Sequence, residues 1–237
     1  MIDLNKINLR KDAVIDLKKK SGLGEAAKAQ VVLALDFSIS MDGLYRNGTV
    51  QDTVERILPF GLAFDDNGEV DFFLFENGSR KLNENITVSN LDGYIQKRVI
   101  GKYNMGGTNY APVLKQIYSE FSAKKGGFLG FGSKPAKMDI PVYVIFITDG
   151  NNSDKSETET IIKEMSKQGF FIQFVGIGNE RFEFLSKLDT LSGTFIDNVN
   201  FLKINNIKTC TDSELYSGLM AEYPGWVQLA KQSNLIV

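Results

Sequence analysis

The chain of 237 residues contains no histidine and only one cysteine. The absence of histidine excludes histidine-ligated zinc, Ser-His-Asp hydrolysis and imidazole acid-base chemistry. Cys210 cannot form an internal disulfide, and its simplest role is that of a small packing residue. No stretch approaches the roughly 20 apolar residues of a membrane-spanning helix. The first residues also lack an apolar run suited to a signal peptide, so we expect a cytoplasmic protein.

The composition is ordinary, with 43% hydrophobic residues, 24% charged residues and a net charge of −2. It lacks the basic excess that accompanies nucleic-acid binding, so we expect no nucleic-acid partner. The length suits one α/β domain better than two. We expect an N-terminal extension at 1–29 packed on a domain at 30–237, which ends in a helical segment at 208–237.

Apolar runs alternate with helical patterns along the chain, which predicts a doubly wound, mostly parallel sheet with helices on both faces. Asn77-Gly78 predicts a hairpin that leads into a polar edge strand at 80–88, so the sheet has one antiparallel edge. The first 30 residues are expected to hold a short strand or helix at the domain edge. Further strands are predicted at 31–36, 70–75, 141–148, 171–176 and 201–204.

Several local signals predict where helices begin or bend. Pro59 is expected to kink or restart the helix over 50–62. Capping boxes are predicted to begin at Ser156 and Thr211, and Thr108 or Asn109 is expected to cap the helix that follows the pair of glycines. Residues 124–139 are rich in glycine and predict a surface insertion.

Acids and hydroxyls stand where apolar runs end. Asp36 ends the first such run, and Ser38 and Ser40 follow it at alternate positions. Asp149 follows a later run, and Thr108 follows a pair of glycines that let the backbone approach closely. Because ligands of open α/β sheets bind at the carboxyl ends of the strands, we expect these side chains to lie together.

These five residues supply two carboxylates and three hydroxyls, the hard oxygen ligands that magnesium and calcium take in proteins. The motif Asp-x-Ser-x-Ser would arise by chance in a chain of this length about one time in ten, so the combination carries the prediction. Asp42 is assigned a capping or solvated role instead. We expect a divalent cation, preferably magnesium, with manganese and calcium as alternatives, held by Asp36, Ser38, Ser40, Thr108 and Asp149.

The three motifs resemble the metal-ion-dependent adhesion site of von Willebrand factor A domains. The likeness runs in order and spacing from Gln30 to Ile207. The stretches 106–112 and 64–69 are similar, more narrowly, to the bacterial A domains of tellurium-resistance gene clusters. One departure is Ile39, where many such domains have glycine.

The resemblance implies that the five residues bind the metal in two different ways. Ser38, Ser40 and Thr108 would coordinate directly, while Asp36 and Asp149 would act largely through bound water. A cation held mainly by neutral hydroxyls keeps an open position for a carboxylate. We therefore expect a non-enzymatic interaction module that binds an Asp or Glu of another protein, in a bacterial stress-resistance system.

Two alternatives remain open. A magnesium-dependent phosphatase or hydrolase could use Asp36 as its nucleophile, although Ser38 stands where that chemistry needs a second acid. A metal-independent scaffold could instead make its contacts through 124–139 or the N-terminal extension. The acids near Asp65 lack calcium-loop spacing, and 127–134 lacks the order of a phosphate-binding loop.

Overall fold

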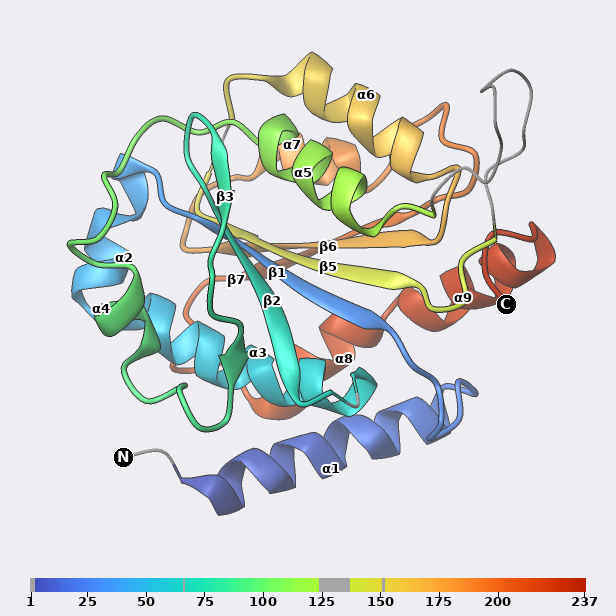
Figure 1. Ribbon diagram of the computed structural model, residues 1–237, viewed down its shortest axis with the longest axis horizontal. Coiled ribbons are helices and arrows are strands. Elements are labelled where there is room, and N and C mark those ends of the chain that lie inside the picture. The colour runs from blue at the N-terminus through green and yellow to red at the C-terminus, as the bar shows by residue number, and fades with distance from the viewer. Residues whose placement is uncertain (1–2, 66, 124–136, 151) are drawn as a thin grey trace.

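A computed structural model describes residues 3–65, 67–123, 137–150 and 152–237. Within them a seven-stranded sheet has the order β3-β2-β1-β5-β6-β7, and β4 also pairs with β2. Figure 1 shows the sheet between two layers of helices. The strands are β1 (Gln30–Asp36), β2 (Glu69–Phe75), β3 (Ser79–Lys81), β4 (Ile86–Thr87), β5 (Val142–Thr148), β6 (Phe170–Ile177) and β7 (Val199–Ile204).

The strands from β2 to β7 through β1, β5 and β6 pair in parallel. Every residue of β5 and β6 is buried, as is all of β1 except Gln30, because helices cover both faces of the sheet. These are the continuous apolar runs of the sequence. The predicted doubly wound, mostly parallel fold is therefore confirmed.

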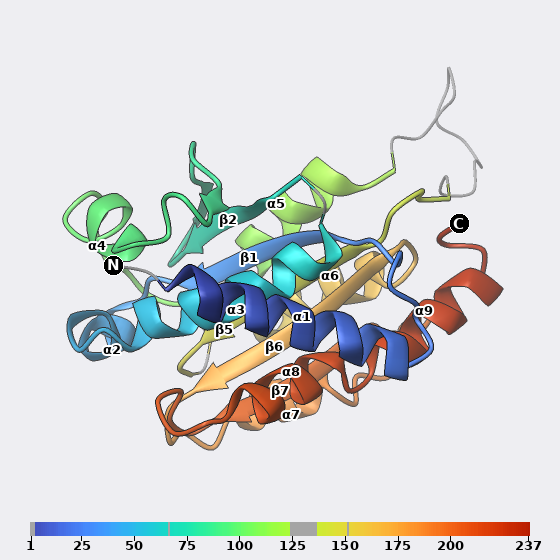
Figure 2. The same cartoon turned by 90° about the horizontal axis from the view of Figure 1, so that it is seen from below.

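Helices α5 and α6 cover one face of the sheet, whereas α3 and α8 lie on the other, with α1 outside them (Figures 1 and 2). None of the described helices is both long and apolar enough to cross a membrane. The helices are α1 (Leu4–Lys20), η1 (Ile39–Met41), α2 (Asp42–Arg46), α3 (Thr49–Phe64), α4 (Tyr94–Arg98), α5 (Ala111–Phe121), α6 (Lys155–Met165), α7 (Glu183–Leu188), α8 (Asp212–Met220) and α9 (Tyr223–Gln232).

The predicted antiparallel edge is present beside β2. Phe75 pairs with Ser79 across the turn that contains Asn77-Gly78, as the hairpin signal predicted. The edge strand is split into β3 and β4, which both pair with β2. Between the two pieces, the Leu82 backbone N–H still donates to the Phe72 carbonyl of β2 at 2.8 Å.

The N-terminal segment forms a helix of 17 residues, longer than the short element expected at the domain edge. Asp3 caps it by accepting hydrogen bonds from the backbone N–H groups of Asn5 and Lys6. The buried Lys18 then joins α1 to the end of α3, since its Nζ donates to the carbonyls of Ala27 (2.6 Å) and Ala63 (2.7 Å). The helix is thus docked along the domain.

Helix α3 does not restart at Pro59, because burial along its length offsets the hydrogen bond that proline cannot donate. The expected start of α6 was wrong. Helix α6 begins at Lys155 after Asp154, so Ser156 does not cap it. The capping box at Thr211 is confirmed at the start of α8. Of the predicted insertion, residues 124–136 lie outside the described residues.

Candidate metal centre

Four of the five proposed metal ligands lie at or just beyond the carboxyl ends of two neighbouring strands. Asp36 is the last residue of β1 and Thr148 the last of β5, and the preceding pair Leu35 and Ile147 are partners in the sheet. Both strands turn into loops at this edge because their apolar runs end there. Asp149 follows Thr148 directly, so parallel pairing brings the acids of two distant segments to one edge.

Four of the five residues form one chain of hydrogen bonds. The Ser38 and Ser40 hydroxyl oxygens are 3.0 Å apart, and the Ser40 hydroxyl donates to Asp149 Oδ1 at 2.9 Å. At the other end, Asp36 Oδ1 accepts from the Ser38 backbone N–H at 2.8 Å. Ser40 is exposed whereas Asp36 is fully buried, so the chain runs from the interior to the surface.

The segment that carries Thr108 is joined to the Ser38 loop through the backbone of Gly106. Ser38 and Gly106 form a β-bridge, and the Ile39 N–H donates to the Gly106 carbonyl at 2.9 Å. Among the described residues, no hydrogen bond joins the Thr108 hydroxyl to the other four. A Cβ at Gly107 would lie 2.4 Å from Asn77 Oδ1, so a larger residue there would have to displace the Asn77 side chain.

Burial makes the charge of Asp36 costly. Its side chain is 0% exposed, and Thr148 Oγ1 donates to its Oδ2 at 2.6 Å. Burial raises the pKa of Asp36 to about 6, against the opposing effect of the hydrogen bonds from Ser38 and Thr148. Burial also raises the pKa of Asp149, partly offset by the hydrogen bond from Ser40. Within the described residues, no cationic side chain pairs with either carboxylate.

Two tyrosines support the site, and sequence reasoning did not identify them. The Tyr110 hydroxyl lies 3.0 Å from Thr148 Oγ1 and donates to the Gly150 carbonyl. The Tyr45 hydroxyl donates to the Asp36 carbonyl at 2.7 Å. Both tyrosines are buried, and burial raises the pKa of each hydroxyl, so both remain neutral donors. The one available signal was that Tyr110 follows Thr108 by two residues.

Asp154 caps α5, in place of the predicted Thr108 or Asn109. Its two carboxylate oxygens accept from the N–H groups of Tyr110 (3.0 Å) and Ala111 (2.7 Å). The neighbouring Ser153 N–H donates to the Thr108 carbonyl at 2.9 Å. The loop after β5 therefore positions the segment that carries Thr108. This contact could not be read from the sequence because it joins residues more than 40 positions apart.

The other acids considered from the sequence have partners of their own. Asp42 pairs with Arg46 one helical turn later, with Nε 2.8 Å from Oδ2. Asp71 pairs with Lys81 at 2.6 Å. Within the described residues, no group of three or more His, Cys, Asp or Glu side chains is placed to hold a metal. The candidate site is therefore one of hydroxyls with two acids.

Ile39 lies between two of the proposed ligands and is 68% exposed, which is unusual for a large apolar side chain. Its backbone is fixed by the Gly106 carbonyl, so the side chain points away from the domain core. Isoleucine at this position therefore forms part of the rim of the candidate site.

Comparisons with known proteins give the family. A sequence model of vWA-TerF-like domains, described as the vWA found in the TerF C terminus, matches residues 28–236. The chain is 37% identical over 234 residues to YcbR of Bacillus subtilis (strain 168), covering 94% of this chain and 90% of YcbR.

Solved structures with low sequence identity share the fold. BatB of Bacteroides thetaiotaomicron is 14% identical with a TM-score of 0.56, covering 86% of this chain and 99% of BatB. The SpRpn10 VWA domain is 13% identical with a TM-score of 0.53, covering 75% of this chain and 88% of that domain.

A third structure is proximal thread matrix protein 1 from the mussel byssus, with a zinc-occupied MIDAS motif. It is 17% identical with a TM-score of 0.52, covering 83% of this chain, while this chain spans only 46% of the mussel protein. The family match and the 37% identity to YcbR are decisive, because they extend over nearly the whole sequence. The chain belongs to the vWA-TerF-like family of von Willebrand factor A domains.

Proposed function

We propose that this domain binds a protein partner through a divalent cation, preferably magnesium. The cation would be held by Asp36, Ser38, Ser40, Thr108 and Asp149. When bound, it would supply an electrophilic position that accepts an Asp or Glu carboxylate of the partner. The domain itself would carry out no reaction, in keeping with the general use of vWA domains as interaction modules.

The observation that carries the proposal is the chain of contacts from Ser38 through Ser40 to Asp149. Ser40 and Asp149 are 109 positions apart in the sequence and share no helix or strand. Hydroxyl and carboxylate oxygens from separate loops that meet at a surface are suited to a hard cation.

The electrostatics of the two acids also fit a cation. Both oxygens of Asp36 accept hydrogen bonds, and the family resemblance implies that this carboxylate acts through water while the serine hydroxyls coordinate directly. Burial raises the pKa of Asp36 and of Asp149, and a nearby positive charge would favour their ionised forms. The residues present therefore match the chemistry of a hydroxyl-rich magnesium site.

The metal can be tested by calorimetric titration of magnesium, manganese, calcium and zinc into protein freed of divalent cations. We expect binding to the native chain and at least about tenfold weaker binding to the double variant Ser38→Ala/Ser40→Ala. Asp42→Asn is the matched control, because Asp42 lies near the site but pairs with Arg46. Equal binding to the native chain and the double variant would refute the site.

The partner can be tested by affinity capture from the native cell with and without a chelator. A partner that is captured only with the metal, and is lost with Ser38→Ala/Ser40→Ala, supports the proposal. Capture that the chelator leaves unchanged would favour the metal-independent scaffold. A cytoplasmic location and a role in resistance to tellurium compounds belong to the same proposal, and the tellurium role rests on the sequence resemblance alone.

An enzymatic role would require a different outcome. A phosphatase that uses Asp36 as nucleophile needs a second acid where Ser38 stands. Turnover of generic phosphoesters with magnesium, abolished by Asp36→Ala, would establish that role in place of the one proposed.

A further inference from the structure

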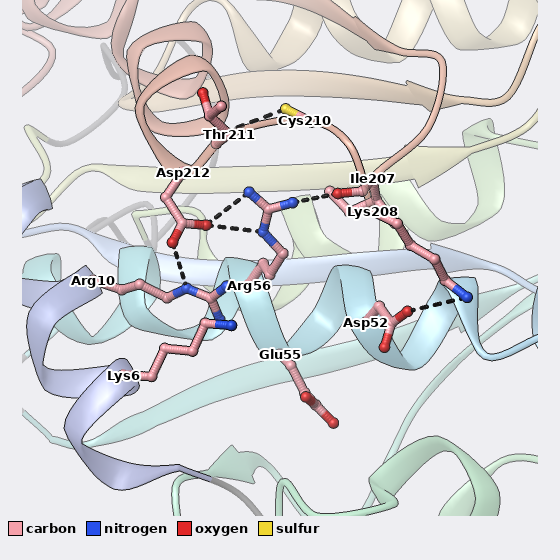
Figure 3. A pocket seen from close by; sticks show the side chains of 10 residues that line it. All are labelled: Lys6, Arg10, Asp52, Glu55, Arg56, Ile207, Lys208, Cys210, Thr211 and Asp212. Carbon is pink, nitrogen blue, oxygen red and sulfur yellow. Dashed lines mark hydrogen bonds and ion pairs between the residues drawn. The ribbon is translucent and has the colours of Figure 1, made fainter.

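A pocket of about 450 Å³ lies between α1, α3 and the segment that leads into α8 (Figure 3). We call it the α1 pocket, and none of the five proposed metal ligands lines it. Helix α1 precedes the region matched by the family model, which begins at residue 28. The pocket therefore depends on a helix that lies outside the matched region. Its lining residues are Lys6, Arg10, Asp52, Glu55, Arg56, Ile207, Lys208, Cys210, Thr211 and Asp212.

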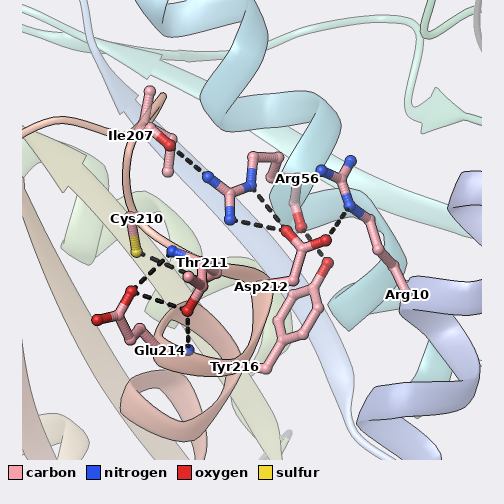
Figure 4. A network of polar contacts seen from close by, with 8 residues as sticks. All are labelled: Arg10, Arg56, Ile207, Cys210, Thr211, Asp212, Glu214 and Tyr216. Atoms are coloured by element: carbon pink, nitrogen blue, oxygen red, sulfur yellow. Dashed lines mark hydrogen bonds and ion pairs between the residues drawn. The ribbon is translucent and has the colours of Figure 1, made fainter.

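The Asp212 carboxylate accepts hydrogen bonds from two guanidinium groups that also line this pocket (Figure 4). Asp212 Oδ1 accepts from Arg56 Nε (3.0 Å) and Nη2 (2.7 Å), while Oδ2 accepts from Arg10 Nε (2.8 Å). Burial alone would raise the pKa of Asp212, but the hydrogen bonds from the two arginines outweigh it and hold that pKa below its ordinary value. Arg56 also donates to the Ile207 carbonyl, so it is fixed from both sides.

Arg10 is held in place with most of its donors unused. Its side chain is only 11% exposed, and within the described residues its two terminal nitrogens have no hydrogen-bond partner. Lys6 lies one helical turn earlier on α1, and no described residue pairs with its Nζ. Two cations at this spacing repel each other in a helix, and an anion bound between them would relieve that repulsion.

The charges are divided across the pocket. Arg10 and Arg56 share Asp212, which leaves one positive charge, and Lys6 adds a second. On the opposite wall, Asp52 lies 3.7 Å from Lys208 and Glu55 accepts a hydrogen bond from Gln51. Figure 3 shows Lys6 and Arg10 on the α1 side, with Asp52 and Glu55 on α3. The α1 side therefore suits an anion, and the α3 side suits a hydrogen-bond donor.

We propose that the α1 pocket binds a small phosphate monoester. Its phosphoryl oxygens would accept from Arg10 and Lys6, and a hydroxyl of the same molecule would donate to Glu55. A phosphate monoester carries about −1.5 to −2 charges and three strong acceptor oxygens at neutral pH, so it offers the donors of Arg10 and Lys6 more acceptors than one carboxylate does. The pocket volume lies within the usual range for small-molecule sites.

Such a ligand would join α1 to the body of the domain. It would contact α1 through Lys6 and Arg10 and α3 through Glu55, beside the Asp212 pairing that already ties α1 to α8. A ligand that binds only the folded state stabilises it by RT ln(1 + L/Kd), where L is the free ligand concentration, so the melting temperature rises once L exceeds Kd. Thermal stability therefore reports occupancy of this site, independently of the metal centre.

The test uses the full chain, freed of divalent cations, with glycerol 3-phosphate and inorganic phosphate as probes. Sodium chloride at equal ionic strength corrects for screening. Lys6→Ala removes an exposed cation that pairs with no described residue, so the fold is preserved, as circular dichroism would verify. Lys20→Ala is the matched control, because it removes the same charge from the last turn of α1, outside the pocket.

We expect glycerol 3-phosphate to raise the melting temperature of the native chain and of Lys20→Ala, with affinity at least about tenfold weaker in Lys6→Ala. Equal affinity for inorganic phosphate would identify the free anion as the source of the phosphoryl group. Equal shifts in Lys6→Ala and Lys20→Ala, or no shift beyond the sodium chloride control, would overturn the proposal.

Discussion

Replacing Asp36 with asparagine separates the folding cost of this carboxylate from its proposed use. Asp36 is fully buried, and its two oxygens accept from the Ser38 N–H and the Thr148 hydroxyl. Asparagine keeps the shape and removes the charge. The Thr148 hydroxyl can turn to accept from the new amide and donate to the Tyr110 hydroxyl, which in turn donates to the Gly150 carbonyl. The substitution therefore keeps these hydrogen bonds and adds one amide N–H, whose burial lowers the expected gain.

The magnitude follows from the pKa of Asp36, which burial raises from 3.8 to about 6. This difference corresponds to about 3 kcal/mol of unfavourable folding free energy when the carboxyl is ionised at pH 7.5. In the absence of metal, we expect Asp36→Asn to be more stable than the native chain at pH 7.5, by up to that amount. The same variant should lose the stabilisation that magnesium gives to the native chain.

The sign of the pH dependence is fixed by the direction of the shift. Between about pH 4 and pH 6 the folded native chain binds more protons at Asp36 than the unfolded chain does, so its stability falls as the pH rises. Asparagine does not titrate. The stability advantage of Asp36→Asn should therefore be largest above pH 6 and should shrink as the pH is lowered toward 4.

Urea unfolding of metal-free protein at pH 7.5 and pH 5.0 measures both effects. Asp42→Asn is the control, because it removes a partly exposed carboxylate that pairs with Arg46, and it should retain the response to magnesium. A variant at position 36 that is clearly less stable than the native chain at both pH values, by the same amount, would refute the reasoning. The ionised carboxylate would then stabilise the fold.

Three further substitutions test the surrounding structure by urea unfolding. Asp154→Ala should cost about 1 to 2 kcal/mol, because the N–H groups of Tyr110 and Ala111 lose their cap, and calorimetry should show weaker magnesium binding as Thr108 shifts; an unchanged stability would contradict this role. Asp212→Ala should lower the free energy of unfolding by about 3 kcal/mol, because it leaves two guanidinium groups without their carboxylate. Lys208→Ala, at an exposed ion pair, should change it by no more than about 0.5 kcal/mol. Similar losses in the two variants would argue against the network around Asp212. Gly61→Ala should cost about 1 to 3 kcal/mol, because the new Cβ would lie 2.6 Å from the Val70 side chain, and a neutral result would mean that Val70 can move.

The sheet could be predicted from the sequence because its signals are local. Continuous apolar runs predicted β1, β5 and β6, and Asn77-Gly78 predicted the hairpin beside β2. The errors arose where a distant contact outweighed a local preference. Packing on both sides keeps α3 intact at Pro59, and Asp154 caps α5 although the sequence offered nearer candidates.

The candidate site, too, could be predicted only in part from the sequence. The sequence identified Ser38, Ser40 and Asp149 as site residues, and the structure brings their side chains into hydrogen-bond contact. Their use by a metal stays a prediction. The residues that support them, Tyr45 and Tyr110, carried no distinctive pattern, because a buried hydroxyl is found through its partner in space and not through its neighbours in sequence.

The sequence by itself determined the order of strands and helices, the family, and the types of oxygen ligand available, because periodicity and short motifs are properties of neighbouring residues. Only the tertiary structure decided which distant groups meet. It buried Asp36 and raised its pKa, placed Asp154 at the start of α5, and docked α1 against α3 and α8. Burial and charge balance depend on the packing of segments far apart in the chain. For that reason, the α1 pocket could not be foreseen from any one segment.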